Sequence, residues 1–451
     1  MDAIAARTER VEPAINAFTE TFFESASAQA ERAEARYARA RRSKGVRLGA
    51  LEGLPLVIKD EVPVEGQRCT NGSLIYREEV STNTAIIAQR LLDAGAIQHA
   101  RTTTPEFCCA TITSSRLWGI SRNPWNPRYT PGGSSGGSAA SLAAGTSLLA
   151  TGSDIAGSIR IPASCCGVVG FKPPYGRVPQ SAPFNLDFYC HEGPLARSVA
   201  DAALMQNTIA GPHPSDVASL KPKLQIPSKF KNIRGWRIAY SLDLGFFRVS
   251  AEVRRNTLEA LQVFEDLGCQ IDEVAVPWSE QTARAAWTYL AHIFGASLAS
   301  LLEEHAGSMT SYARAFIESS ARSSAEDYVR SFETVGEMQS FFGPLLERYD
   351  VFVCPTTTRP ALTANAKLGY ESFEAEGKSM PSGLSWCMTY PFNMLSRCPV
   401  LAVPSGFGQT GVPTGIQIVG KTYDDVSVFR AAAAFEQASP WLQDSARRPS
   451  L

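Results

Sequence analysis

The 451-residue sequence has no excess of either charge, because 43 Lys and Arg stand against 44 Asp and Glu and leave a formal net charge of −1. Nucleic acids and anionic membrane surfaces recruit proteins through clustered positive charge, so neither is an expected partner. No apolar run approaches the roughly 18 residues of a membrane span. The charged N-terminus, MDAIAARTERVEP, lacks the apolar core of a secretion signal. We therefore expect a cytoplasmic protein.

The ten cysteines and five histidines show no pattern typical of a metal or redox site. The sequence contains no C-x-x-C and no H-x-x-x-H, and Cys108 with Cys109 and Cys165 with Cys166 are adjacent pairs. Adjacent cysteines are poor disulfide frameworks and poor zinc ligands. We predict no metal, no cofactor and a reducing compartment, with most cysteines serving as small buried apolar residues.

What the sequence does contain is an alternation of short apolar runs and helical stripes. Strands are predicted for Leu54–Ile58 and Ile97–Arg101, with a helix over Asn83–Ala94 between them. This alternation is typical of an α/β layer architecture. There is no repeat, long linker or break in composition, so we predict one domain over residues 1–451. It is expected to have an N-terminal helical segment over 1–50, a helical segment near the pocket over 281–348, and a polar tail over 441–451 that frays.

The most unusual stretch runs from Thr130 to Pro173 and holds two glycine-serine clusters, at 132–138 and 152–158. Glycine and serine are common in flexible linkers, but the run Leu142–Ala150 between the clusters is too apolar for a linker. Glycine also lets successive backbone N–H groups turn toward one point. The stretch is therefore predicted to be packed core that carries two tight loops.

Three kinds of chemistry use serines or glycines in loops of this sort. Residues 132–136 formally match G-x-S-x-G, but that motif should follow a strand directly, and here a proline-rich loop precedes it. A phosphate loop would need Gly-Lys-Ser/Thr, which does not follow the glycines. A serine nucleophile activated by a lysine also accounts for Lys59, a charge at the end of an apolar strand where burial is costly. The alternative for Lys59 is a surface lysine at a strand end.

With these motifs in place, the chain resembles the amidase signature hydrolases over nearly its whole length. The motifs that carry the resemblance are GLPLVIKD at 53–60, TPEF at 104–107, RNPWNP at 122–127, TPGGSSGGSAA at 130–140, SDIAGSIRIPASCCGVVGFKPPYGRV at 153–178, HEGPLARSVADAALM at 191–205, DVFVCPT at 350–356, PFN at 391–393 and GIQIVG at 415–420. The resemblance implies a single α/β/α domain around a large mixed twisted sheet.

The resemblance also implies a Ser–Ser–Lys catalytic triad. Lys59 matches the lysine, Ser134 the bridging serine that follows a cis peptide bond, and Ser158 the nucleophile. We expect burial to lower the pKa of Lys59 toward the working range. Neutral Lys59 would then accept a proton from Ser134, which would accept one from Ser158.

The turn before the nucleophile is expected to hold the oxyanion. Its donors would be the backbone N–H groups of Ile155, Ala156 and Gly157. Supporting roles are expected for Ser135, Asp154 and Arg160, although Asp154 and Arg160 could equally be plain scaffold. The sequence departs from the family pattern at Ala156, where glycine is usual, at 396–398 (Ser-Arg-Cys) after PFN, and in lacking most of the usual first helix.

The substrate is expected to be an apolar or aryl amide, or a carbamate, and the enzyme a monomer or homodimer. Residues predicted to contact the substrate, with burial in the core as the alternative, are Phe184, Phe188, Tyr189, Trp386 and Tyr390. A second hypothesis is the glutaminase subunit of a tRNA-dependent amidotransferase, which would need partner chains and a pocket for the glutamine carboxylate. A third, a non-catalytic binding relative, is disfavoured because all three triad residues are present.

Overall fold

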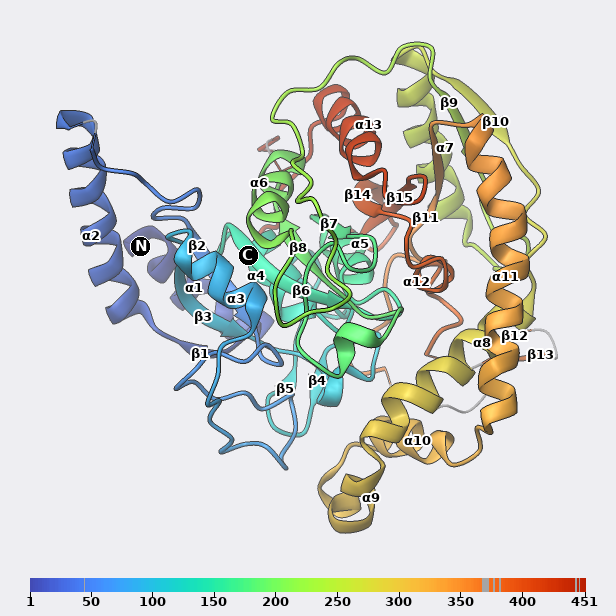
Figure 1. Cartoon of the computed structure of the whole chain (residues 1–451), viewed down its shortest axis with the longest axis horizontal. Helices are drawn as coiled ribbons and strands as arrows, with labels where there is room; N and C mark the ends of the chain where they lie inside the picture. The colour runs from blue at the N-terminus through green and yellow to red at the C-terminus, as the bar shows by residue number, and fades with distance from the viewer. Residues whose placement is uncertain (44, 367–372, 376–377, 381–382, 443, 446) are drawn as a thin grey trace.

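An eleven-stranded mixed sheet forms the centre of the protein (Figure 1). The structure, a computed structural model, describes residues 1–43, 45–366, 373–375, 378–380, 383–442, 444–445 and 447–451. In spatial order the strands are β1 (Phe18–Thr21), β3 (Ile97–Thr102), β2 (Pro55–Lys59), β6 (Leu149–Asp154), β8 (His191–Ala196), β7 (Val169–Lys172), β14 (Val400–Phe407), β15 (Pro413–Val419), β11 (Val351–Pro355), β9 (Arg237–Tyr240) and β10 (Gln270–Glu273). Neighbouring strands are parallel from β3 through β2 to β6 and from β11 through β9 to β10. The strands from β6 through β8, β7, β14 and β15 to β11 pair antiparallel.

Helices cover both faces of this sheet, and a further group of helices lies at one end of the molecule (Figure 1). They are α1 (Asp2–Ile15), α2 (Phe23–Arg42), α3 (Ile86–Asp93), α4 (Gly136–Ala144), α5 (Arg160–Cys166), α6 (Val199–Ile209), α7 (Ala251–Asp266), α8 (Glu280–Leu290), α9 (Ala299–His305), α10 (Ser311–Ser320), α11 (Ala325–Arg348), α12 (Pro391–Met394) and α13 (Asp425–Ala438). Short helical turns are η1 (Glu106–Cys108), η2 (Phe184–Leu186), η3 (Ala291–Gly295) and η4 (Ala306–Ser308). Two small hairpins pair β4 (Ser114–Ser115) with β5 (Gly119–Ile120) and β12 (Phe373–Ala375) with β13 (Lys378–Met380).

The side-chain alternation of β2 shows why both sheet faces are covered. Leu56 and Ile58 point to one face and join the core formed with α3, α6, α7 and α13. Val57 points to the other face and joins the core formed with α1, α4 and α5. A strand that is buried on both faces reads as a continuous apolar run, as this one does. By the same alternation Lys59 shares the face of Val57, which is the face that α4 covers.

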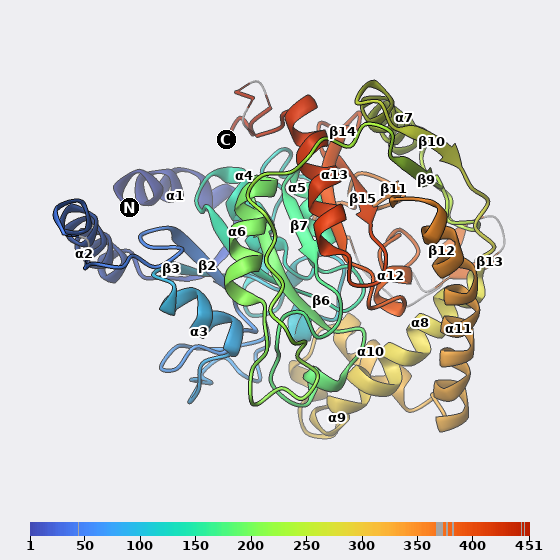
Figure 2. The same ribbon diagram turned by 45° about the horizontal axis from the view of Figure 1, so that its top comes forward.

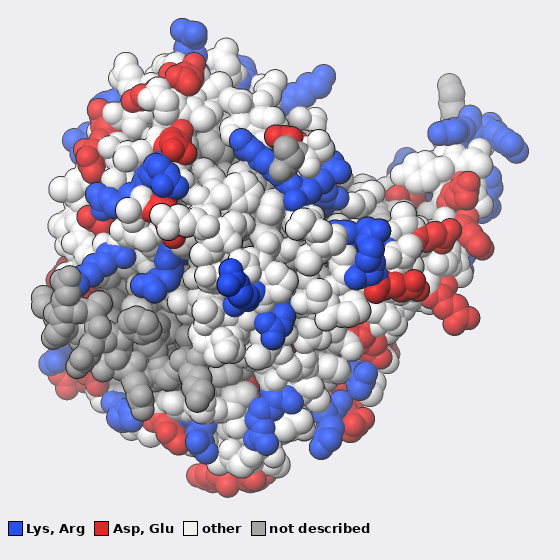
Figure 3. All heavy atoms as spheres, turned by 180° about the vertical axis from the view of Figure 1, so that it is seen from behind, with Lys and Arg blue, Asp and Glu red and all other residues white. Residues whose placement is uncertain are grey.

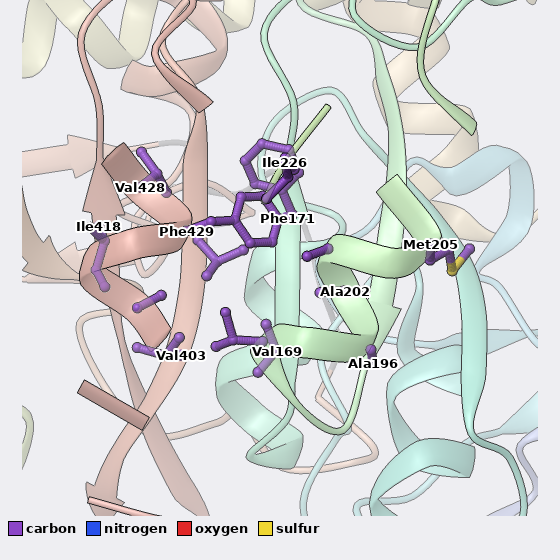
Figure 4. Packing of buried hydrophobic residues seen from close by; sticks show 14 of the residues in the cluster. Val169, Phe171, Ala196, Ala202, Met205, Ile226, Val403, Ile418, Val428 and Phe429 are labelled. Carbon is purple, nitrogen blue, oxygen red and sulfur yellow. The ribbon is translucent and has the colours of Figure 1, made fainter. Parts of the chain in front are cut away.

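The larger core lies between the sheet and the helices α6 and α13, which cover the same face (Figure 2). Figure 4 shows Val169 and Phe171 of β7 beside Ala202 of α6 and Phe429 of α13. The rings of Phe171 and Phe429 meet edge to face, with their centroids 4.7 Å apart. This layered arrangement confirms the α/β architecture around a large mixed sheet.

The two ends of the chain differ from the expectations. The segment 1–50 is not only helical, because β1 interrupts it and pairs antiparallel with β3. The chain begins with the helix α1, which spans Asp2–Ile15. The tail does not simply fray: Trp441 and Leu442 are buried in the core beside α4 and α5, and Trp441 stacks on Phe407.

The segment 281–348 is mostly helical, as predicted, and α8, α10 and α11 lie together at one end of the molecule (Figure 1). Among the described residues, no single helix combines the length and hydropathy needed to cross a membrane. Two consecutive helical segments, Glu280–Gly295 and Ala299–Ser308, have that length and hydropathy only when they are counted together, and the chain bends by 64° between them. On the face in Figure 3, basic and acidic side chains are interspersed, in keeping with the balanced net charge.

Candidate active site

Lys59 ends β2 on the face that α4 covers, and its side chain is fully buried. Its Nζ donates to Ser134 Oγ at 2.7 Å and to Ser153 Oγ at 2.9 Å, and it lies 3.0 Å from Glu61 Oε1. The surface-lysine alternative is therefore wrong. The contact between Lys59 and Ser134 joins positions 75 residues apart in the chain.

Ser134 and Ser158 lie at the two glycine-rich loops that the sequence singled out. The peptide bond before Ser134 is cis, as the resemblance implies. The Ser135 N–H donates to the Ser158 carbonyl at 3.1 Å, which ties the first loop to the second. Ser158 is 7% exposed and borders a cavity, whereas Ser134 is fully buried. Among the described residues Ser158 Oγ has no hydrogen-bond partner, so the link from Ser134 to Ser158 stays a prediction.

The turn from Asp154 to Ser158 is held by a buried ion pair. Arg160 binds the Asp154 carboxylate with two hydrogen bonds of 2.9 Å, and both side chains are inaccessible to solvent. Burial alone would raise the pKa of Asp154, but the Arg160 charge and hydrogen bonds outweigh burial and hold that pKa well below its usual range. Asp154 also accepts from the Gly157 N–H at 2.8 Å. Asp154 and Arg160 thus hold the loop, as expected.

This bonding changes the prediction for the oxyanion hole. The Gly157 N–H already binds Asp154, so in this structure Gly157 is a poor donor to an oxyanion. Ile155 and Ala156 border the cavity beside Ser158, and their N–H groups have no hydrogen-bond partner among the described residues. The candidate donors are therefore reduced to Ile155 and Ala156.

The expected direction of the pKa shift at Lys59 was wrong. Burial lowers the pKa of Lys59, but the interactions of Lys59 with Cys108 and with the Glu61 carboxylate raise it, and the net pKa is above its ordinary value. Burial also raises the pKa of the Cys108 thiol, so that thiol is uncharged at neutral pH. The carboxylate of Glu61, 3.0 Å away, is therefore the charge that favours the ammonium form of Lys59.

The cavity beside Ser158 is mostly apolar, and it is lined by residues from α8, η3 and α10 rather than by those predicted to contact the substrate. Its described lining is Cys108, Cys109, Ala110, Thr111, Ile155, Ala156, Ser158, Trp287, Leu290, Phe294, Phe316, Gly383 and Leu384. None of the five predicted substrate-contact residues is in this lining.

The predicted substrate-contact residues mostly pack elsewhere. Tyr189 and Tyr390 are buried in the core, and Tyr189 stacks on Tyr289 with a centroid separation of 3.7 Å. Trp386 is buried and donates to Oγ1 of the lining residue Thr111 at 3.0 Å.

The other two predicted substrate-contact residues lie nearer the surface. Phe188 is 38% exposed and lies below the guanidinium of Arg397, one of the departures from the family pattern. Phe184 meets the cavity residue Phe294 edge to face, with the centroids 5.8 Å apart.

The comparisons with known proteins identify the family of the chain. A family model described as Amidase matches residues 1–429. The chain belongs to the amidase signature family.

Among relatives, the chain is 35% identical over 449 residues to the acylamidase of Rhodococcus erythropolis, covering 98% of this chain and 91% of that protein. It is 33% identical over 475 residues to the A-type subunit of the glutamyl-tRNA(Gln) amidotransferase of Cyanothece sp., covering 99% and 94%. The crystal structure of a bacterial aryl acylamidase of the amidase signature family superposes with a TM-score of 0.89 at 28% identity, covering 98% and 93%.

Several residues of this amidase signature site carry structural roles that sequence reasoning did not assign. Arg160 reaches Asn393 Oδ1 at 2.7 Å and Gln417 Oε1 at 2.6 Å, which explains the PFN and GIQIVG motifs. Thr389 Oγ1 donates to the Ala156 carbonyl at 2.6 Å. Glu61 contacts Lys59 directly. Asn393 and Gln417 stand in motifs of the sequence, namely PFN and GIQIVG, but no sequence motif pointed to Glu61.

Gly157 is a position where a side chain cannot fit. Its φ is +127°, and an added Cβ would overlap the Thr389 hydroxyl. We expect Gly157→Ala to displace the turn that carries Ile155 and Ala156 and to lower kcat by about 10²- to 10³-fold. Steady-state kinetics on an anilide would measure the loss. Gly336→Ala, at an exposed helical glycine with open space around it, is the matched control; equal rates in the two variants would contradict this role.

Proposed function

We propose that this protein is a serine amidohydrolase that cleaves the C–N bond of an amide through an acyl-enzyme on Ser158. The observation that carries the proposal is the 2.7 Å contact between buried Lys59 Nζ and Ser134 Oγ, with Ser158 at the adjoining loop facing an apolar cavity. A lysine beside a serine is the arrangement of a base that activates a hydroxyl nucleophile.

The reaction begins when Lys59 has lost its proton. Its free electron pair then accepts the proton of Ser134, and Ser134 accepts the proton of Ser158 as Ser158 Oγ attacks the substrate carbonyl carbon. The N–H groups of Ile155 and Ala156 stabilise the oxyanion that forms. The C–N bond breaks as Ser134 returns a proton to the nitrogen, and water then hydrolyses the ester on Ser158 by the same relay.

The apolar cavity defines the proposed substrate class. Trp287, Phe294 and Phe316 offer aromatic surface beside Ser158, and no Lys or Arg is in the lining that the structure describes. Such a surface favours an amide with an aryl or alkyl group. A carbamate with a similar group presents the same C–N bond and belongs to the proposed class. The acylamidase and aryl acylamidase relatives support the same choice.

The glutaminase-subunit hypothesis is the second candidate, and the relative from Cyanothece sp. is the observation that favours it. A glutamine substrate carries a carboxylate, which calls for a cationic partner in the pocket. The described lining supplies none, so we rank this candidate below hydrolysis of an apolar amide.

A substrate panel tests the proposal. The purified chain would be assayed against an anilide, an alkyl amide, an ester and a carbamate that share one acyl or aryl group, and against glutamine. We expect turnover of the anilide without any partner chain. Turnover of glutamine alone, or no activity without other subunits, would contradict the proposal.

A further inference from the structure

Glu61 lies two residues after Lys59 and returns to contact it. The Lys59 ammonium group has three N–H bonds and three acceptors around it, namely Ser134 Oγ at 2.7 Å, Ser153 Oγ at 2.9 Å and Glu61 Oε1 at 3.0 Å. Ser153 Oγ donates in turn to Glu61 Oε1 at 2.7 Å. Lys59, Ser153 and Glu61 therefore form a closed triangle of contacts, in addition to the contact between Lys59 and Ser134.

All three contacts can form in either protonation state: an ammonium ion donates to all three oxygens, and a neutral amine donates to two of them and accepts from the Ser134 hydroxyl. The carboxylate of Glu61 decides between the two states in favour of the ammonium ion. To accept the proton of Ser134, Lys59 must give up its donation to Ser134 and lose a proton. Glu61 opposes that loss because a carboxylate 3.0 Å away stabilises the positive charge.

Among the acidic groups near Lys59, Glu61 is the dominant negative charge at neutral pH, and Arg101, a buried cation close by, donates to the Lys59 carbonyl oxygen at 3.4 Å. Glu192 of β8 pairs in register with Ser153, and burial, together with the charge of Glu61, raises the pKa of Glu192 to about 8. The Cys108 thiol faces Lys59 from η1, and burial raises its pKa as well. Glu192 and Cys108 are thus largely uncharged at pH 7.

The neighbours of Glu61 also hold its carboxylate in one orientation. Its Oε1 accepts from Ser153 and contacts Lys59, whereas its buried Oε2 has no hydrogen-bond partner among the described residues. The carboxylate is therefore held by Ser153 and Lys59. Neither Ser153 nor Glu61 takes part in the proposed reaction, so their joint placement calls for a separate role.

We propose that Glu61 is a positioning residue that holds Lys59 as an ammonium ion in the resting enzyme and thereby sets the pH at which the proton relay operates. This inference rests on the proposed function, because it concerns the proton that Lys59 must lose before Ser158 attacks. It makes the enzyme most active on the alkaline side of neutrality.

Glu61→Gln tests the proposal because glutamine has the same size, keeps an acceptor oxygen and removes the charge. The rate requires neutral Lys59, and the charge of Glu61 raises the pKa of that group, so removing the charge lowers it. The rising limb of kcat/KM against pH, measured with an anilide, is expected to move to lower pH by about 1 to 3 units. We also expect a lower plateau, since the glutamine side chain holds Lys59 less firmly.

Two further variants separate charge from position. Glu61→Asp keeps the charge, so the rising limb of its pH profile is expected to lie close to that of the wild type. Ser153→Ala removes a neutral acceptor of Lys59 and the hydroxyl that donates to Glu61 but keeps the carboxylate, so it should lower the plateau and move the limb much less than Glu61→Gln does. Fluorophosphonate labelling of Ser158 against pH gives a second profile for each variant that does not depend on the anilide.

The outcomes are distinct. A limb that moves much further in Glu61→Gln than in Ser153→Ala supports the proposal. A limb that stays in place in Glu61→Gln while the plateau falls, or one that moves equally in both variants, would overturn it. If Glu61→Gln does not fold, failure of Glu61→Asp to keep the wild-type limb would also overturn it. A wild-type enzyme that forms no acyl-enzyme on Ser158 would instead refute the proposed function.

Discussion

Replacing Lys59 with methionine is expected to lower kcat/KM for an anilide by about 10³- to 10⁴-fold at every pH. Methionine fills a similar volume, but it offers no basic electron pair to the Ser134 hydroxyl that now lies 2.7 Å from Nζ. Ser134 then has no acceptor for the proton that it takes from Ser158. Glu61 keeps its hydrogen bond from Ser153, so the loop should stay in place.

The control for this variant is Lys229→Met, which changes an exposed lysine outside the site in the same way. Far-UV circular dichroism and the thermal midpoint would establish that both variants are folded. If the Lys59 variant lost less than tenfold in kcat/KM, the role of Lys59 as the base would be wrong.

Ser158→Ala is expected to remove activity almost completely, by roughly 10⁴- to 10⁶-fold in kcat. The substitution deletes the only atom that the mechanism uses to attack the carbonyl and leaves the Asp154–Arg160 pair untouched. The same variant should take up no fluorophosphonate. Ser228→Ala, at an exposed serine, should react like the wild type. Continued labelling of the Ser158 variant would show that another residue is the nucleophile.

The fold was predictable where local pattern determines it. The run Leu54–Ile58 lies between two helical layers, so its apolar character on both faces marked a buried strand, and β2 occupies Pro55–Lys59. The strand β1 was missed because its pairing with β3 is a contact between distant segments. The buried tail was missed for a similar reason: Trp441 packs against Trp125 and Phe407, which are far away in sequence.

The candidate site was predictable in its motifs and not in its surroundings. Lys59, Ser134 and Ser158 stand in motifs that identify them. The cavity lining was missed because aromatic residues at irregular spacing, such as Trp287 and Phe294, read equally well as core, and only the packing of α8 and η3 beside Ser158 brings them to the site. The effect of Glu61 was missed because the motif around Lys59 indicates burial, whereas the position of a carboxylate two residues later depends on how the chain turns.

The proposed reaction requires an acyl group carried by Ser158, and that intermediate can be trapped without any substitution in the chain. The wild-type enzyme would be mixed with an anilide, quenched in acid during turnover, digested, and mapped by mass spectrometry. We predict one added acyl mass on the peptide that contains Ser158, localised to that serine by fragmentation. An acyl group on another residue such as Cys108, or turnover with no acylated peptide, would contradict the proposed reaction.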